Sequence, residues 1–199
     1  MRIAALVLAA LPAAALAQIG NPGFMDPTTR FESPGVPAPN QSNVTDKLFA
    51  RLAAEGGRAE VVFGELAAGK AGDSEVGDFA RMMVEDHTAA NERLAGVAEA
   101  GGIPLPDALN PEHAAELDRL EGLEGAAFDL EYMRGQVVDH QKTVQLLVYE
   151  IGQGQNGDLQ RFAAATLPTV LHHLESARAI VSRLAEEQIA EAEPSPPPR

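Results

Sequence analysis

Cysteine and tryptophan are both missing from this chain of 199 residues. Without cysteine, the protein cannot form disulfides, thiolate metal sites or iron–sulfur clusters, and it has neither a thiol nucleophile nor a cysteine-linked lipid anchor. Aromatic residues make up only 5% of the chain, although 45% of the residues are hydrophobic. Alanine and leucine must therefore supply most of the core, which favours helices over sheets.

Basic residues are also scarce. The chain has 15 Lys and Arg against 29 Asp and Glu, and its formal net charge is −14. Such a surface repels phosphate backbones and anionic headgroups. We therefore expect no nucleic-acid partner and no attachment to anionic lipid, whereas a metal ion or a cationic partner is compatible with this charge.

The first residues have the pattern of a secretory signal peptide. Arg2 precedes an apolar run at 3–11, and the small-residue pattern at 15–17 is typical of a cleavage site. A membrane-spanning helix needs ~20 apolar residues, and Pro12 leaves this segment short. We therefore favour cleavage after residue 17 over retention as an anchor, and we predict a periplasmic or otherwise exported protein without a membrane span after cleavage.

Composition divides the rest of the chain into three parts. Residues 18–43 are rich in Pro, Gly, Asn and Ser, which is typical of a flexible leader. Residues 44–188 show helical periodicity and weak strand signals. Residues 189–199 end in a proline-rich stretch, and we expect a disordered tail there.

The helical domain contains four long amphipathic segments and one short segment. We expect long helices at about 44–70, 74–100, 124–152 and 158–188, and a short helix at 111–121. Short turns join the first two and the last two long helices, which makes each pair antiparallel. The sequence therefore predicts an all-α fold: an antiparallel four-helix bundle of the ferritin-like kind, with the short helix between helices two and three.

Two positions within these helices carry residues that disfavour helix. Gly56 and Gly57 each cost ~1 kcal/mol relative to alanine in a helix interior. They indicate either the close approach of a neighbouring helix or a local break. Pro168 removes one hydrogen bond and crowds the carbonyl of Ala164, so we expect a kink there.

One polar residue on each long helix lies on or beside the apolar seam. They are Glu60, His87, His140 and His173. When heights are counted from the connecting turns, neighbouring members differ by about three residues, or less than ~5 Å. The four side chains could therefore share one layer of the bundle core, where metal and cofactor sites are built.

Three imidazoles and one carboxylate are suitable ligands for Zn, Fe, Cu or Ni. Asp86 and Asp139 precede two of the histidines and could serve as extra ligands or as hydrogen-bond partners that orient the rings. The alternative is that the histidines are hydrogen-bonded core residues, that Glu60 is a half-exposed acid and that the aspartates form salt bridges. Both interpretations remain open at this point.

Other polar residues point to structure more than to chemistry. Asp129 and Tyr132 lie two to three turns before His140, too far for the same layer, and we expect a buried hydrogen bond from them. His113, in the first turn of the short helix, is expected to face solvent. No nucleophile, phosphate-binding loop or paired acid–base motif is present, so we identify no catalytic residue.

Several short motifs carry a resemblance to a known family. They are AEV and ELA within 59–67, FARMMVEDH at 79–87, GAAFDLEYM at 125–133, DH at 139–140, and LP with HL within 167–174. Through these motifs, about residues 44–185 resemble the bacterial domain-of-unknown-function 4142 (DUF4142) proteins. The resemblance implies a ferritin-like bundle exported to the bacterial envelope, without a known activity.

The Glu-x-x-His pairs of ferritins and di-iron oxygenases are not reproduced in this chain. Val84 and Val137 stand three residues before His87 and His140, which argues against ferroxidase or oxygenase chemistry. Three hypotheses remain: an exported bundle with one transition-metal site, a structural or partner-binding envelope protein without a metal, and a metal-dependent redox enzyme.

Overall fold

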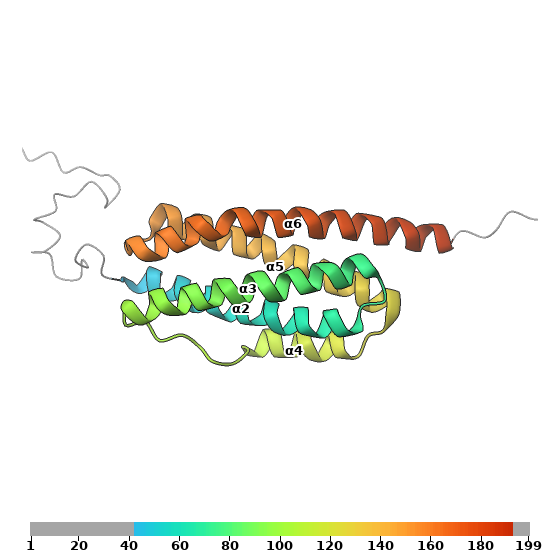
Figure 1. The fold of residues 1–199 in the computed structure, drawn as a ribbon, viewed down its shortest axis with the longest axis horizontal. Helices are drawn as coiled ribbons and strands as arrows, with labels where there is room; N and C mark the ends of the chain where they lie inside the picture. The colour runs from blue at the N-terminus through green and yellow to red at the C-terminus, as the bar shows by residue number, and fades with distance from the viewer. Residues whose placement is uncertain (1–41, 193–199) are drawn as a thin grey trace, which may run out of the picture. The chain divides into compact units, whose positions relative to one another are not determined.

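The computed structural model describes residues 42–192 and contains five helices and no strand in that range. The helices are α2 (Val44–Lys70), α3 (Ser74–Ala100), α4 (Pro111–Glu121), α5 (Gly125–Gln153) and α6 (Gly157–Ala192) (Figure 1). The all-α prediction is therefore confirmed for this part of the chain. The expected signal peptide, the leader up to residue 41 and the tail from residue 193 lie outside the described residues.

Local hydrogen bonds explain where the helices begin. Asn43 and Asp46 form a capping box at the start of α2. The side chains of Asp73, Asn110 and Asn156 accept hydrogen bonds from backbone N–H groups in the first turns of α3, α4 and α6. These N–H groups have no carbonyl partner within their own helices, and the capping residues therefore fix the helix starts that the sequence predicted.

The last helix is longer than predicted. α6 continues to Ala192, so the expectation of a disordered tail is wrong for residues 189–192. These four residues are alanine, glutamate and isoleucine, none of which breaks a helix, and the next proline is Pro194. Pro168 lies within α6, which continues on both sides of it.

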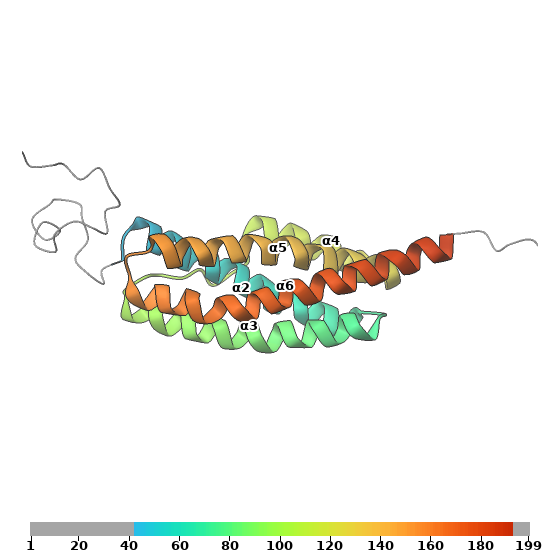
Figure 2. The ribbon, with the colours of Figure 1, turned by 90° about the horizontal axis from the view of Figure 1, so that it is seen from above.

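The four long helices pack in two hairpins. α2 packs along α3, and α5 packs along α6, each pair joined by a turn of three residues at 71–73 or 154–156. α3 also contacts α6, and α2 contacts α5, while the short α4 contacts α2 and α5 (Figures 1 and 2). In the part of the chain described here, no helix is long and apolar enough to cross a membrane.

The apolar core consists of two clusters separated along the helices. One contains Phe63, Met83 and Met133, and the other contains Leu94 and Leu147. On α3, α5 and α6, the histidines of interest lie in the stretch between the residues of one cluster and those of the other. The fold therefore places a buried polar layer between two apolar ones.

Glycines on α2 allow the close approach of α3. A Cβ atom at Gly57 would lie 2.1 Å from Asn91 Oδ1, and one at Gly64 would lie 2.9 Å from Val84 Cγ2. α2 is continuous through both positions. The glycine pair at 56–57 therefore includes one close-contact position and marks no break in the helix.

Candidate metal centre

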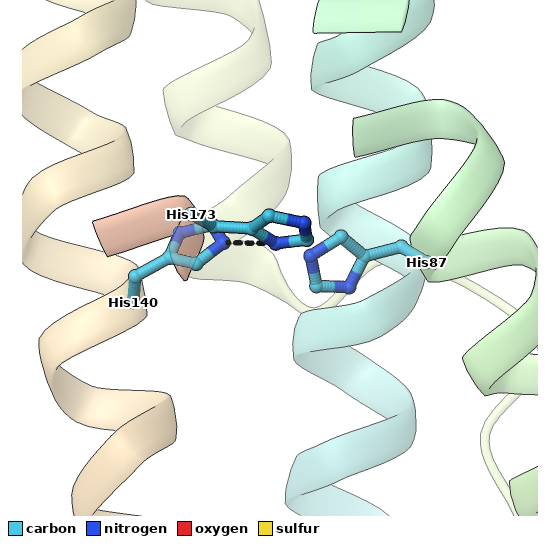
Figure 3. Close-up of side chains that lie close together, drawn as sticks. All are labelled: His87, His140 and His173. Carbon is cyan, nitrogen blue, oxygen red and sulfur yellow. Dashed lines mark hydrogen bonds between the residues drawn. The ribbon is translucent and has the colours of Figure 1, made fainter. Parts of the chain in front are cut away.

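Three histidines from three helices meet in the buried polar layer. His87 comes from α3, His140 from α5 and His173 from α6, and their rings point toward one another (Figure 3). One nitrogen of each ring can be chosen so that all three atoms lie within 4.8 Å of one another. The residues are 7%, 1% and 1% exposed, which makes this a cluster inside the core.

Hydrogen bonds on the outer side of two rings determine where their protons lie. His140 Nδ1 is 2.9 Å from the backbone carbonyl oxygen of Gln136, and His173 Nε2 is 2.8 Å from Asp86 Oδ2. A carbonyl or carboxylate oxygen accepts a hydrogen bond, so each of these nitrogens must donate its proton. In the neutral rings, the lone pairs therefore remain on His140 Nε2 and His173 Nδ1.

These two nitrogens face each other at 3.3 Å. With both rings neutral, neither nitrogen has a proton to donate to the other, and two lone pairs are in close contact. His87 Nε2 is also buried and has no hydrogen-bond partner among residues 42–192. A buried polar atom without a partner is costly, so the cluster is suited to a ligand that attracts lone pairs.

Burial favours the neutral forms of His87 and His173. The pKa of His87 is lowered to about 3, mainly by burial and in addition by the neighbouring His140 and His173. Burial also lowers the pKa of His173, against the opposing effect of its hydrogen bond to Asp86. Neutral imidazole is the form that binds metals.

Glu60 lies behind His140, away from the facing nitrogens. Its Oε2 accepts a hydrogen bond of 2.7 Å from Gln136 Nε2, and its Oε1 is 3.7 Å from His140 Nδ1. Glu60 is only 4% exposed, and burial raises its pKa. The structure therefore places Glu60 neither among the converging nitrogens nor on the half-exposed surface that the alternative expected.

The two aspartates beside the histidines have different positions. Asp86 bonds to His173, as expected of a residue that orients a ring. Asp139 instead pairs with Lys142 at 3.1 Å and has no hydrogen bond to any of the three histidines. Gln136 was not identified from the sequence, although its position one turn before His140 places both on one face of the helix.

Asp129 and Tyr132 do not form the hydrogen bond that the sequence suggested. Asp129 accepts hydrogen bonds from the backbone of Gly72 and Asp73, at 3.1 and 2.9 Å, and so links the start of α5 to the α2–α3 turn. The Tyr132 hydroxyl is buried without a partner among the described residues, and burial and the charge of Glu60 raise its pKa.

The family profile described as "Domain of unknown function (DUF4142)" matches residues 31–180. The chain belongs to the DUF4142 family. A search of curated proteins found no match to this DUF4142 chain.

Solved structures share the fold of this DUF4142 protein at low sequence identity. A DUF305 fragment from Deinococcus radiodurans is 14% identical, with a TM-score of 0.64, and the match covers 72% of this chain and 99% of that one. A Bacillus halodurans protein with a provisional spore coat assignment is 15% identical, with a TM-score of 0.50, and the match covers 80% and 95% of the two chains. At this identity, the likeness concerns the fold alone.

A small cavity reaches the histidine cluster of this DUF4142 domain from the side of α3 and α6. Its volume is about 100 Å³, and its lining includes Asp86, His87, Arg93, Thr166 and His173. The hydroxyl of Thr166 is buried and has no partner within residues 42–192. The cavity offers a route by which an ion and one small ligand could reach the imidazoles.

Proposed function

We propose that this DUF4142 protein binds one divalent transition-metal ion through His87, His140 and His173. The observation that supports the proposal most strongly is the pair of unprotonated nitrogens facing each other at 3.3 Å. Two nitrogens bound at ~2.0–2.1 Å to a tetrahedral zinc ion are ~3.3–3.4 Å apart. The spacing therefore matches that of two ligands around one ion.

The surroundings of the rings support the same proposal. Metal-bound histidines usually donate their second N–H to a carboxylate or a backbone carbonyl, and His173 and His140 each do so. Imidazole suits Zn, Cu, Fe and Ni. Three protein ligands leave a fourth position for water or another small ligand, which the cavity beside Thr166 could accommodate.

We also propose an exported protein in which the bundle has the antiparallel, ferritin-like topology. The signal-like pattern at residues 1–17 supports export to the periplasm, and the proline-rich leader at 18–43 would then link the bundle to the envelope. The two three-residue turns and the pairing of α2 with α3 and of α5 with α6 support the topology.

The competing hypothesis is an envelope protein in which the histidines serve packing alone. It requires an extra proton between His140 and His173, and burial disfavours that proton by lowering the pKa of His173. A redox enzyme would need, besides the metal, a substrate and measurable turnover. Among residues 42–192, no group beyond the three histidines favours a redox enzyme.

Metal content of the tag-free protein tests the proposal. After exposure to Zn²⁺, Cu²⁺ or Fe²⁺ and removal of free ion, we expect about one equivalent bound. His140→Ala should abolish binding while the helical circular-dichroism signal persists. The exposed neighbour of His173, His172, provides a matched control, and His172→Ala should bind like the unmodified protein. Less than a tenth of an equivalent of every ion would eliminate the site.

A further inference from the structure

A second and larger cavity opens between α2, α4 and α5. Its volume is about 510 Å³, which is within the range of small-molecule sites. Its wall includes apolar side chains from Leu52, Ala59, Leu146 and Tyr149. Leu52 and Tyr149 are 38% and 53% exposed, so part of this apolar lining faces solvent and could cover the body of a ligand.

The charged residues of this cavity are mostly acidic. Four carboxyl side chains line it, from Glu55, Glu60, Glu112 and Asp139. The one lysine in the lining, Lys142, is held by Asp139 at 3.1 Å and by Glu112 at 3.6 Å. A negatively charged cavity in a protein with a net charge of −14 attracts cations.

The most buried of these carboxyl groups, that of Glu60, has one oxygen that accepts no hydrogen bond from the described residues. Glu60 is 4% exposed, and its Oε1 makes no hydrogen bond within the described residues, whereas its Oε2 accepts one from Gln136. The nearby His140 Nδ1, at 3.7 Å, already donates to the Gln136 carbonyl. A ligand N–H group in the cavity would supply the missing donor, and a charged one would favour the ionised carboxylate.

We infer that this cavity binds a small organic cation with an apolar body, most simply a primary amine on a hydrocarbon or aromatic chain. The ammonium group bonds to Glu60 at the inner end, and the apolar body lies against Leu146 and Tyr149. The Tyr149 ring offers an aromatic surface for that body. This inference goes beyond the metal site, because the cavity shares no residue with the three histidines.

Three probes of one shape and different charge test the ligand class. They are 4-phenylbutylamine, 4-phenylbutanol and 4-phenylbutyrate, each titrated by calorimetry into the full chain after treatment with EDTA. We expect the amine to bind with a Kd between about 10 µM and 1 mM, and the alcohol and the acid to bind at least tenfold more weakly. Equal binding of all three, or no saturable binding of the amine, would overturn the inference.

A substitution that fills the cavity tests its location. Gly56 lines the cavity, and a Cβ atom there would have no neighbour within 4 Å. Gly56→Leu should weaken amine binding at least tenfold. The matched control is Gly69→Leu, because Gly69 is on the same helix, also has no neighbour within 4 Å and lies outside the cavity lining. Unchanged binding in Gly56→Leu would contradict the assignment.

Glu60→Gln provides a second variant that keeps the size of the side chain. We expect this substitution to weaken binding of the amine at least fivefold and to leave the weak binding of the alcohol unchanged. An equal effect on both probes would contradict the role of the charge. Because the titrations use metal-free protein, failure of the amine site and failure of the metal site give separate results.

Discussion

His140 Nε2 and His173 Nδ1 lie 3.3 Å apart, while the second nitrogen of each ring donates to an oxygen of Gln136 or Asp86. This arrangement leaves two lone pairs in contact inside the core, next to His87 Nε2, which has no hydrogen-bond partner among residues 42–192. A metal ion bound between the two nitrogens, as proposed above, would remove that contact.

Asp86→Ala should weaken zinc binding by about 10- to 100-fold, because the carboxylate fixes the proton on His173 Nε2 and leaves Nδ1 free to bind. Competition with a chelator of known affinity would measure the change. Asp139→Ala is the matched control, since Asp139 pairs with Lys142 and not with a histidine. Similar losses in the two variants would show that Asp86 has no special role.

The metal-free protein should lose stability in acid. The unfolded chain takes up a proton on His87 as the pH falls below about 6.5, but burial keeps the folded pKa at about 3. Between these values, the unfolded state binds more protons, and the free energy of unfolding falls by up to ~1.4 kcal/mol per pH unit for this residue. Urea unfolding at pH 7 and pH 5 measures this fall in the free energy of unfolding. In His87→Leu the slope should be smaller, and an unchanged slope would contradict the prediction.

Asp46 and Glu150 form a buried acidic pair near the α5–α6 turn. This pair should make the protein less stable as the pH rises, which is opposite to the effect of His87. Glu150 is fully buried, and burial and the adjacent Asp46, through its charge and a side-chain hydrogen bond, raise the pKa of Glu150 to about 8. The folded state therefore holds a proton that the unfolded state loses above about pH 4.5, and stability falls as the pH rises from there to about 8.

Glu150→Gln should accordingly stabilise the protein at pH 8 by on the order of 2 kcal/mol and have little effect at pH 4.5. Thermal unfolding at the two pH values measures this difference. Glu186→Gln, at an exposed position on α6, should have no comparable effect. A variant that is less stable at pH 8 than the unmodified protein would contradict the account.

Gly64→Ala should destabilise the bundle by about 1–3 kcal/mol, because the added Cβ atom would lie 3.0 Å from the Ala80 carbonyl and 2.9 Å from Val84 Cγ2. Gly69→Ala on the same helix meets nothing within 4 Å and should be neutral or stabilising by up to ~1 kcal/mol. Denaturant unfolding of the pair measures the contrast. Equal stability would show that α2 and α3 can separate without cost.

The helix starts could be predicted because their signals are local. Asn110 before Pro111, and Asp73 after a glycine, act within one turn of their own helix. The common height of the three histidines along the bundle was also predictable. The rise per residue of a helix is constant, and the short turns give a reference point from which residues can be counted.

The sequence did not show how α2 is rotated about its own axis, and so the direction of the Glu60 side chain could not be predicted. Residue counting gives its height, but its position behind His140 depends on how α2 packs against α5, and hence on Gln136. The pair Asp46 and Glu150 was missed for a similar reason. The two residues are more than a hundred positions apart and meet only where the start of α2 contacts the α5–α6 turn.

X-ray absorption at the zinc edge, on the one-to-one complex of the full chain, tests the central claim most directly. Three imidazole nitrogens at ~2.0–2.1 Å, with one further light ligand, are the predicted shell. In His140→Ala, the zinc should be lost under the same conditions. A shell composed of carboxylate oxygens, or a complex that survives the loss of His140, would contradict a centre built from His87, His140 and His173.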